Sequence, residues 1–146
     1  MPQLLLFTPC RRASIDFDDK LLSISAVFTG ISFVAASVAP DATVPYDWAV
    51  ALQWLILPGE LGQVFETRVR LRLPDGAVWK GLDETHKIKA EYTTSNGVIN
   101  VPNFPIGQTG QLMLVAEIKN AEDPDWQIAA EHPMFATVIE ASTPTP

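Results

Sequence analysis

Apolar and charged side chains alternate along residues 65–73, and this pattern constrains the fold more than any other feature of the sequence. The first set of positions is apolar or small: Phe65, Thr67, Val69, Leu71 and Leu73. The positions between them are charged: Glu66, Arg68, Arg70 and Arg72. Because successive side chains of a strand point to opposite faces, the segment predicts a strand with one face in a core and the other facing solvent or a partner. Such a half-buried strand is typical of an antiparallel sheet.

Glycine and proline recur at short intervals, and few segments keep a helical period for three turns, so many short strands are expected. The main ones are residues 4–7, 14–17, 21–28, 31–34, 46–57, 86–94, 98–104, 112–118, 126–131 and 134–139. The tripeptide Pro74-Asp75-Gly76 and the pair Asn96-Gly97 predict hairpin turns, and Pro133 predicts an edge or a bulge. A loop is expected at 35–45, with a short helix at 35–42 or 83–89 as the alternative to extended structure.

The length of 146 residues favours one domain over two. We predict a single-domain, antiparallel β-sandwich, immunoglobulin-like or C2-like, with about eight to ten strands. The domain is expected to cover residues 1–139, followed by a flexible tail at 140–146. Trp48 and Trp54 share the apolar face of the long strand 46–57 and are therefore expected in the core.

The formal net charge of −7 argues against binding to nucleic acid or to an anionic membrane surface. No apolar stretch approaches the length of about 20 residues that a membrane helix needs. Cys10 is the single cysteine, so no intramolecular disulfide can form, and a cytoplasmic location is expected. Charged residues make up 18% of the chain, a low share that predicts a contact surface.

Enzymatic and metal-binding signatures are weak. A nucleophilic Cys10 would need His86 or His132 as its base, whereas a lone cysteine after a short apolar strand is typical of packing. We therefore predict no enzyme, no catalytic residue, no cofactor and no metal. Weak calcium binding would have its best candidates in Asp16, Asp18 and Asp19, which also suit a plain polar turn.

Two sets of residues are candidates for binding. Arg68, Arg70 and Arg72 lie on one strand face, about 7 Å apart, and could dock an acidic partner or a second copy of the chain. The alternative is a solvated face on which acidic residues such as Glu91 or Glu117 neutralise the row. Trp79 and Trp126 lie next to turns and could form a platform for a sugar or another small ligand.

Four segments, in order, resemble a bacterial family of short β-domain proteins, the domain of unknown function 6941. They are residues 4–10 (LLLFTPC), 48–50 (WAV), 70–76 (RLRLPDG) and 100–105 (NVPNFP), the last followed by Gly107 and Gly110. The resemblance covers nearly the whole chain and implies a compact bacterial β-domain. It implies no activity and no catalytic residue.

These observations predict a non-catalytic interaction or scaffold domain that binds a protein partner or itself. The arginine row, the low charge and the available sheet edges support that function. A module that binds a small ligand or a carbohydrate through the two tryptophans is the alternative, and an enzyme that uses Cys10 is the third hypothesis.

Overall fold

A computed structural model describes residues 1–35 and 38–140 of the chain. These residues form nine strands and, as their one helical element, the 3-10 helix η1 at Pro58–Glu60. The strands are β1 (Gln3–Ile15), β2 (Leu22–Val27), β3 (Gly30–Ala35), β4 (Thr43–Leu55), β5 (Val64–Arg72), β6 (Val78–Lys89), β7 (Thr94–Pro105), β8 (Gly110–Asn120) and β9 (Gln127–Glu140).

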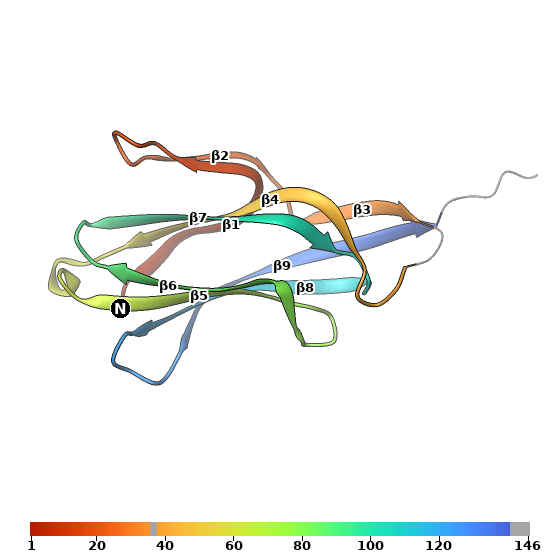
Figure 1. Ribbon diagram of the computed structural model, residues 1–146. Helices are drawn as coiled ribbons and strands as arrows, with labels where there is room; N and C mark the ends of the chain where they lie inside the picture. The colour runs from red at the N-terminus through yellow and green to blue at the C-terminus, as the bar shows by residue number, and fades with distance from the viewer. Residues whose placement is uncertain (36–37, 141–146) are drawn as a thin grey trace, which may run out of the picture.

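The nine strands form two sheets, which we call sheet A and sheet B. Sheet A has the order β2-β1-β4-β7 and sheet B has the order β3-β9-β8-β5-β6. Figure 1 shows the two sheets as layers, with β4 and β7 in one and β5, β6, β8 and β9 in the other. The prediction of an all-β sandwich is confirmed. One pair departs from the antiparallel arrangement, because β3 lies parallel to β9.

The core lies between the two sheets because each long strand turns its apolar positions inward. Sheet A contributes Trp48, Val50, Leu52 and Trp54 of β4 together with Ile99 and Val101 of β7. Sheet B contributes Phe65, Val69 and Leu71 of β5, Leu112, Leu114, Ala116 and Ile118 of β8, and Met134 and Ala136 of β9. The alternation along 65–73 is confirmed in β5, whose apolar positions are buried. The core position of Trp48 and Trp54 is confirmed as well.

The turn between β5 and β6 is the one predicted at Pro74-Asp75-Gly76. Leu73 accepts a backbone hydrogen bond from Gly76 and donates one to Ala77, which closes the turn. Gly76 has a φ of +88°, a conformation that glycine adopts without steric conflict. β6 then runs as one strand through residues 83–89, so the alternative of a helix there is wrong.

β1 is a single strand where the sequence predicted two, at 4–7 and 14–17. It pairs with β4 as far as Cys10, which lies opposite Ala49, and it pairs with β2 from Cys10, opposite Val27, to Ile15. The chain therefore changes partner without leaving the extended conformation, so Pro9 and the two arginines end no strand. The outer half of β1 and β2 form a hairpin, which we call the arm and which stands off from the layers in Figure 1.

The predicted hairpin at Asn96-Gly97 is wrong. Both residues lie inside β7, where they pair with Gln53 and Leu52 of β4. The preceding strand, β6, belongs to sheet B and β7 belongs to sheet A, so the connection after Lys89 crosses between the sheets. Local composition indicated a turn here, but pairing with β4 keeps this segment extended.

β9 is continuous where two strands were predicted at 126–131 and 134–139. Pro133 pairs with Met113 of β8, and β3 joins the other side of β9 only from Phe135 onward. Pro133 thus lies where β9 is locally an edge, as predicted, and its missing N–H breaks no ladder bond there. The predicted tail at 140–146 lies, after Glu140, outside the described residues.

Candidate functional site

The predicted arginine row lies on the outer face of sheet B and is partly neutralised by one carboxylate of the chain, Glu117. Arg68 lies opposite Glu117 in the pairing of β5 with β8. Arg68 donates from Nη2 to Glu117 Oε2 at 2.8 Å, and Arg70 donates from Nη2 to Oε1 of the same carboxylate at 2.6 Å. Within residues 1–35 and 38–140, Arg72 makes no ion pair. Two of the three arginines therefore serve a contact inside sheet B.

The environment of Glu117 shows the strength of that contact. Its side chain is 7% exposed, although it lies on the outer face of a sheet. Burial by itself would raise the pKa of Glu117, but the hydrogen bonds and charges of Arg68 and Arg70 outweigh burial and hold the pKa below its ordinary value. The carboxylate is therefore ionised at neutral pH and stabilises the row.

The two candidate tryptophans lie on opposite faces of sheet B. Trp126 lies on the outer face, with the Arg68 guanidinium carbon 4.3 Å and the Lys119 Nζ 5.3 Å from its ring centroid. Trp79 packs against the core cluster from the inner face and lines a cavity of about 530 Å³ at one end of the sandwich. Its ring lies so close to Gly81 that a Cβ there would overlap it. The structure therefore does not join Trp79 and Trp126 into one platform.

Cys10 is fully buried, and its Sγ donates to the carbonyl oxygen of Ala49 at 3.6 Å. Burial raises the pKa of the thiol, which keeps it protonated. The described contacts of the histidines lie elsewhere: His86 pairs with Glu84, and His132 Nδ1 lies 3.0 Å from the carbonyl oxygen of Pro133. The geometry thus favours a packing role for Cys10.

The aspartates of the first turn, between β1 and β2, hydrogen-bond within that turn. Asp16 Oδ1 accepts backbone hydrogen bonds from Asp18 at 2.8 Å and from Asp19 at 3.1 Å. The hydrogen bonds from Asp19 and then Asp18 lower the pKa of the Asp16 carboxyl. No group of three or more potential ligands that could hold a metal ion occurs among the residues that the structure describes.

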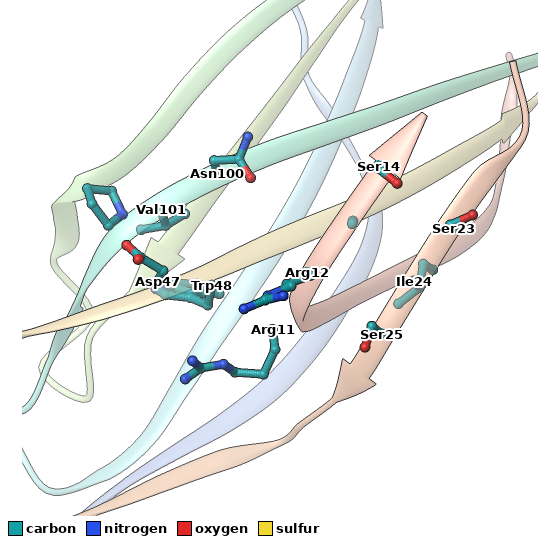
Figure 2. A pocket seen from close by; sticks show the side chains of 12 residues that line it. Arg11, Arg12, Ser14, Ser23, Ile24, Ser25, Asp47, Trp48, Asn100 and Val101 are labelled. Atoms are coloured by element: carbon teal, nitrogen blue, oxygen red, sulfur yellow. The ribbon is translucent and has the colours of Figure 1, made fainter. Parts of the chain in front are cut away.

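A groove of about 850 Å³ lies between the arm and sheet A, and we call it the arginine groove. Its lining is Arg11, Arg12, Ala13, Ser14, Ser23, Ile24 and Ser25 from the arm, and Asp47, Trp48, Asn100, Val101 and Pro102 from β4 and β7. Figure 2 shows Arg11 and Arg12 reaching from β1 toward the wall that carries Asp47 and Trp48. The groove exists because β1 leaves β4 after Cys10 while β4 continues alongside β7.

Small residues hold the arm against the outer face of sheet A. Cys10, Ala49 and Ala51 are buried there, and Leu22 and Ile24 of the arm pack onto them. The tip is tied to β7 by a hydrogen bond of 2.9 Å from Asn96 Nδ2 to the carbonyl oxygen of Lys20. This groove was not predicted from the sequence. Two adjacent arginines next to a strand of an acidic chain were its signal.

The outer edge of β3, which we call the β3 edge, has no pairing strand in the described part of the chain. Phe135 donates its backbone N–H to the carbonyl oxygen of Thr29. Since alternate residues of a parallel ladder bond to the same neighbour, the backbone groups of Ser32 and Val34 point away from β9. Beside them, the outer face exposes Val34 (70%), Ile139 (50%) and Phe135 (46%).

The other side of the sandwich is protected against strand pairing. β6 carries Lys80, Asp83, Glu84, Lys87 and Lys89. β7 carries Pro102. Charges and prolines are the usual devices that block edge-to-edge association. β3 has neither, and no charged residue occurs anywhere in residues 21–40. This charge-free run is the sequence signal that could have identified the β3 edge.

The fold defines an all-β protein of two facing sheets, with a free strand edge on sheet B and a polar groove on sheet A. No helix in the described residues is both long and apolar enough to cross a membrane. No protein-family model matches the chain, and a search of curated proteins finds no match either. The resemblance to the domain of unknown function 6941 therefore stays a prediction.

Proposed function

We propose that this protein is a non-catalytic interaction domain that associates with a second copy of itself by strand pairing at the β3 edge. The observation that carries the proposal is the unprotected edge itself, whose Ser32 and Val34 present free backbone groups. An exposed strand edge is a template for another strand, and main-chain hydrogen bonds supply the affinity.

Charge favours a second copy at the β3 edge over the charged edge strand β6. Two chains of net charge −7 repel each other at long range. Two paired β3 strands place no charged side chains of their own against each other, because β3 is uncharged. The apolar side chains of Val34, Ile139 and Phe135 would be buried beside the paired strands, which adds hydrophobic stabilisation.

The predicted arginine row is a weaker candidate for this contact. Arg68 and Arg70 already bind Glu117, so an acidic partner would have to compete with a carboxylate held within the chain. The surroundings of Cys10 support the absence of thiol catalysis. We also propose a cytoplasmic location, because the single cysteine is a buried free thiol.

Sedimentation equilibrium over a range of concentrations tests the proposal. We expect a reversible dimer for the native chain. Val34→Lys places a charge at the edge, and Ser32→Pro removes an N–H that points to solvent, so each should weaken dimerisation at least tenfold. Thr85→Lys, at an exposed position of the charged strand β6, is the matched control and should leave the dimer unchanged.

Circular dichroism should show that all three variants keep the fold. A native chain that sediments as a monomer at every concentration would contradict self-association. A dimer that survives both Val34→Lys and Ser32→Pro would show that the contact lies elsewhere.

A further inference from the structure

The arginine groove supports an inference that does not depend on self-association, because it lies on sheet A, whereas β3 belongs to sheet B. Arg11 and Arg12 follow Cys10, the last residue of β1 that pairs with β4 and the first that pairs with β2. Both side chains are exposed and line the groove. The bend of β1 thus brings two adjacent arginines to the same hollow, although neighbouring residues of a regular strand point to opposite faces.

Arg11 is held in place without being neutralised. Its guanidinium carbon lies 4.1 Å from the centroid of the Tyr46 ring. Stacking on an aromatic ring uses the face of the guanidinium and leaves its N–H edge free to donate. Among the residues that the structure describes, neither Arg11 nor Arg12 makes an ion pair. Two positive charges therefore face the groove of an otherwise acidic chain.

The remaining walls complete a site of mixed chemistry. Ser14, Ser23, Ser25 and Asn100 contribute hydroxyl and amide groups. Ile24 and Pro102 contribute apolar surface. The volume of about 850 Å³ is within the range of small-molecule sites. Such walls suit a ligand with one anionic group and an apolar body.

Asp47 limits the charge of the anion that the arginine groove can bind. It lines the same groove as Arg11 and Arg12, so the three charged side chains sum to one positive charge. One carboxylate balances that charge, whereas a phosphate monoester with about two negative charges near neutral pH exceeds it. The planar fork of arginine also matches the two oxygens of a carboxylate.

We propose that the arginine groove binds a monocarboxylate with an apolar body, through Arg11 and Arg12. The carboxylate lies against the two guanidinium groups, and the body extends along Ile24 and Pro102. Either a free organic acid or the C-terminal carboxylate of a peptide has this chemistry.

Backbone amide spectra recorded by NMR during titration test the proposal. Hexanoate is the first probe and hexanamide, its uncharged counterpart, is the second. We expect hexanoate to shift the amide signals of residues 11–14 and 23–25, and we expect hexanamide to leave them in place. Tetra-alanine with a free or an amidated C-terminus separates the two sources: shifts with the free form alone assign the site to a peptide end as well as to a free acid.

Arg11→Gln and Arg12→Gln should each weaken hexanoate binding about tenfold or more. Arg72→Gln is the matched control, since it removes the same charge from the outer face of sheet B, and it should change nothing. Val34→Lys should also bind hexanoate normally, which separates this site from the dimer contact. All variants change exposed or half-exposed side chains, and their amide spectra report whether the fold is kept.

Three results would overturn the proposal. They are unshifted spectra with both hexanoate and tetra-alanine, an equal loss of affinity in Arg72→Gln, and tighter binding of inorganic phosphate than of hexanoate. The last result would assign the groove to a phosphate-bearing ligand.

Discussion

Arg68 binds both carboxylate oxygens of Glu117, with 3.2 Å from Nε to Oε1 and 2.8 Å from Nη2 to Oε2. The two residues are direct cross-strand partners on β5 and β8. Bidentate pairs of arginine and a carboxylate are among the strong ion pairs of proteins. Trp126 covers it from outside by stacking on the Arg68 guanidinium. Arg68 and Arg70, which the sequence offered as a surface for a partner, therefore form a half-buried network of ion pairs with Glu117.

Glu117→Gln should lower the free energy of unfolding by about 3 kcal/mol at pH 7, because it leaves two half-buried arginines without a counter-charge. Urea denaturation followed by circular dichroism measures the change. Glu91→Gln is the control: Glu91 and Lys89 form an exposed pair at 3.7 Å, and its loss should change stability by less than about 1 kcal/mol. Equal effects of the two substitutions would show that Glu117 is no more than a surface charge.

The same carboxylate predicts how stability depends on pH. The pKa of Glu117 is lower in the folded chain than in the unfolded chain, so below the unfolded value the unfolded chain binds more protons. The contribution of Glu117 is complete above an unfolded pKa of about 4.3 and is lost as the pH falls through the lower folded pKa. The stability difference between the native chain and Glu117→Gln should therefore shrink below about pH 4. A difference that stays constant to pH 2 would contradict this assignment.

Cys10 should not react with iodoacetamide at neutral pH while the chain is folded. The thiol is fully buried and its pKa is raised, so the reactive thiolate is scarce and covered. Mass spectrometry should show labelling in concentrated urea and none in buffer over the same time. Rapid labelling of the folded chain would contradict this prediction and would support a function in which the Cys10 thiol reacts.

Ala51→Leu should loosen the arm. Ala51 is fully buried beneath the arm, and additional methyl groups in a packed site destabilise by about 1–3 kcal/mol. Arg11, Arg12 and Lys20 in the arm are trypsin sites, so limited trypsin digestion should cut the variant there sooner than the native chain. Ala77→Leu, an exposed position in the turn after β5, should leave the cleavage rate unchanged. Equal protection of the arm in Ala51→Leu would show that small residues at this position are not required.

Leu114→Ala should destabilise the sandwich by about 3 kcal/mol, because it opens a cavity where β8 faces sheet A. Leu114 is fully buried in the core cluster. Leu61→Ala, at an exposed position, should change stability by about 0.5 kcal/mol or less. Thermal unfolding of both variants measures the difference, and a small effect of Leu114→Ala would place the core elsewhere.

Part of this fold could be predicted because its signals are local. The alternation from Phe65 to Leu73 places one face of β5 in the core whatever its neighbours are. Pro74-Asp75-Gly76 forms a turn because Gly76 supplies the positive φ that the turn requires. Asn96-Gly97 shows the limit of the same reasoning, because its long-range pairing with β4 overrides a turn-forming composition.

The candidate sites show the same division. The sequence predicted that Arg68 and Arg70 share a face, and it offered Glu117 as a neutralising neighbour among alternatives. It could not choose between a free row and a paired one, since that depends on which strand lies beside β5. The groove at Arg11 and Arg12 depends on where β1 leaves β4, and the β3 edge depends on β3 lying last in its sheet.

The sequence by itself determined the class of fold, the burial of the tryptophans of β4 and the faces of β5. These follow from side-chain periodicity, which acts within one strand. The tertiary structure alone decided strand order, the crossing from β6 to β7, the burial of Glu117 and the arginine groove. Each of these depends on contacts between residues far apart in the chain, and short-range patterns carry no information about such partners.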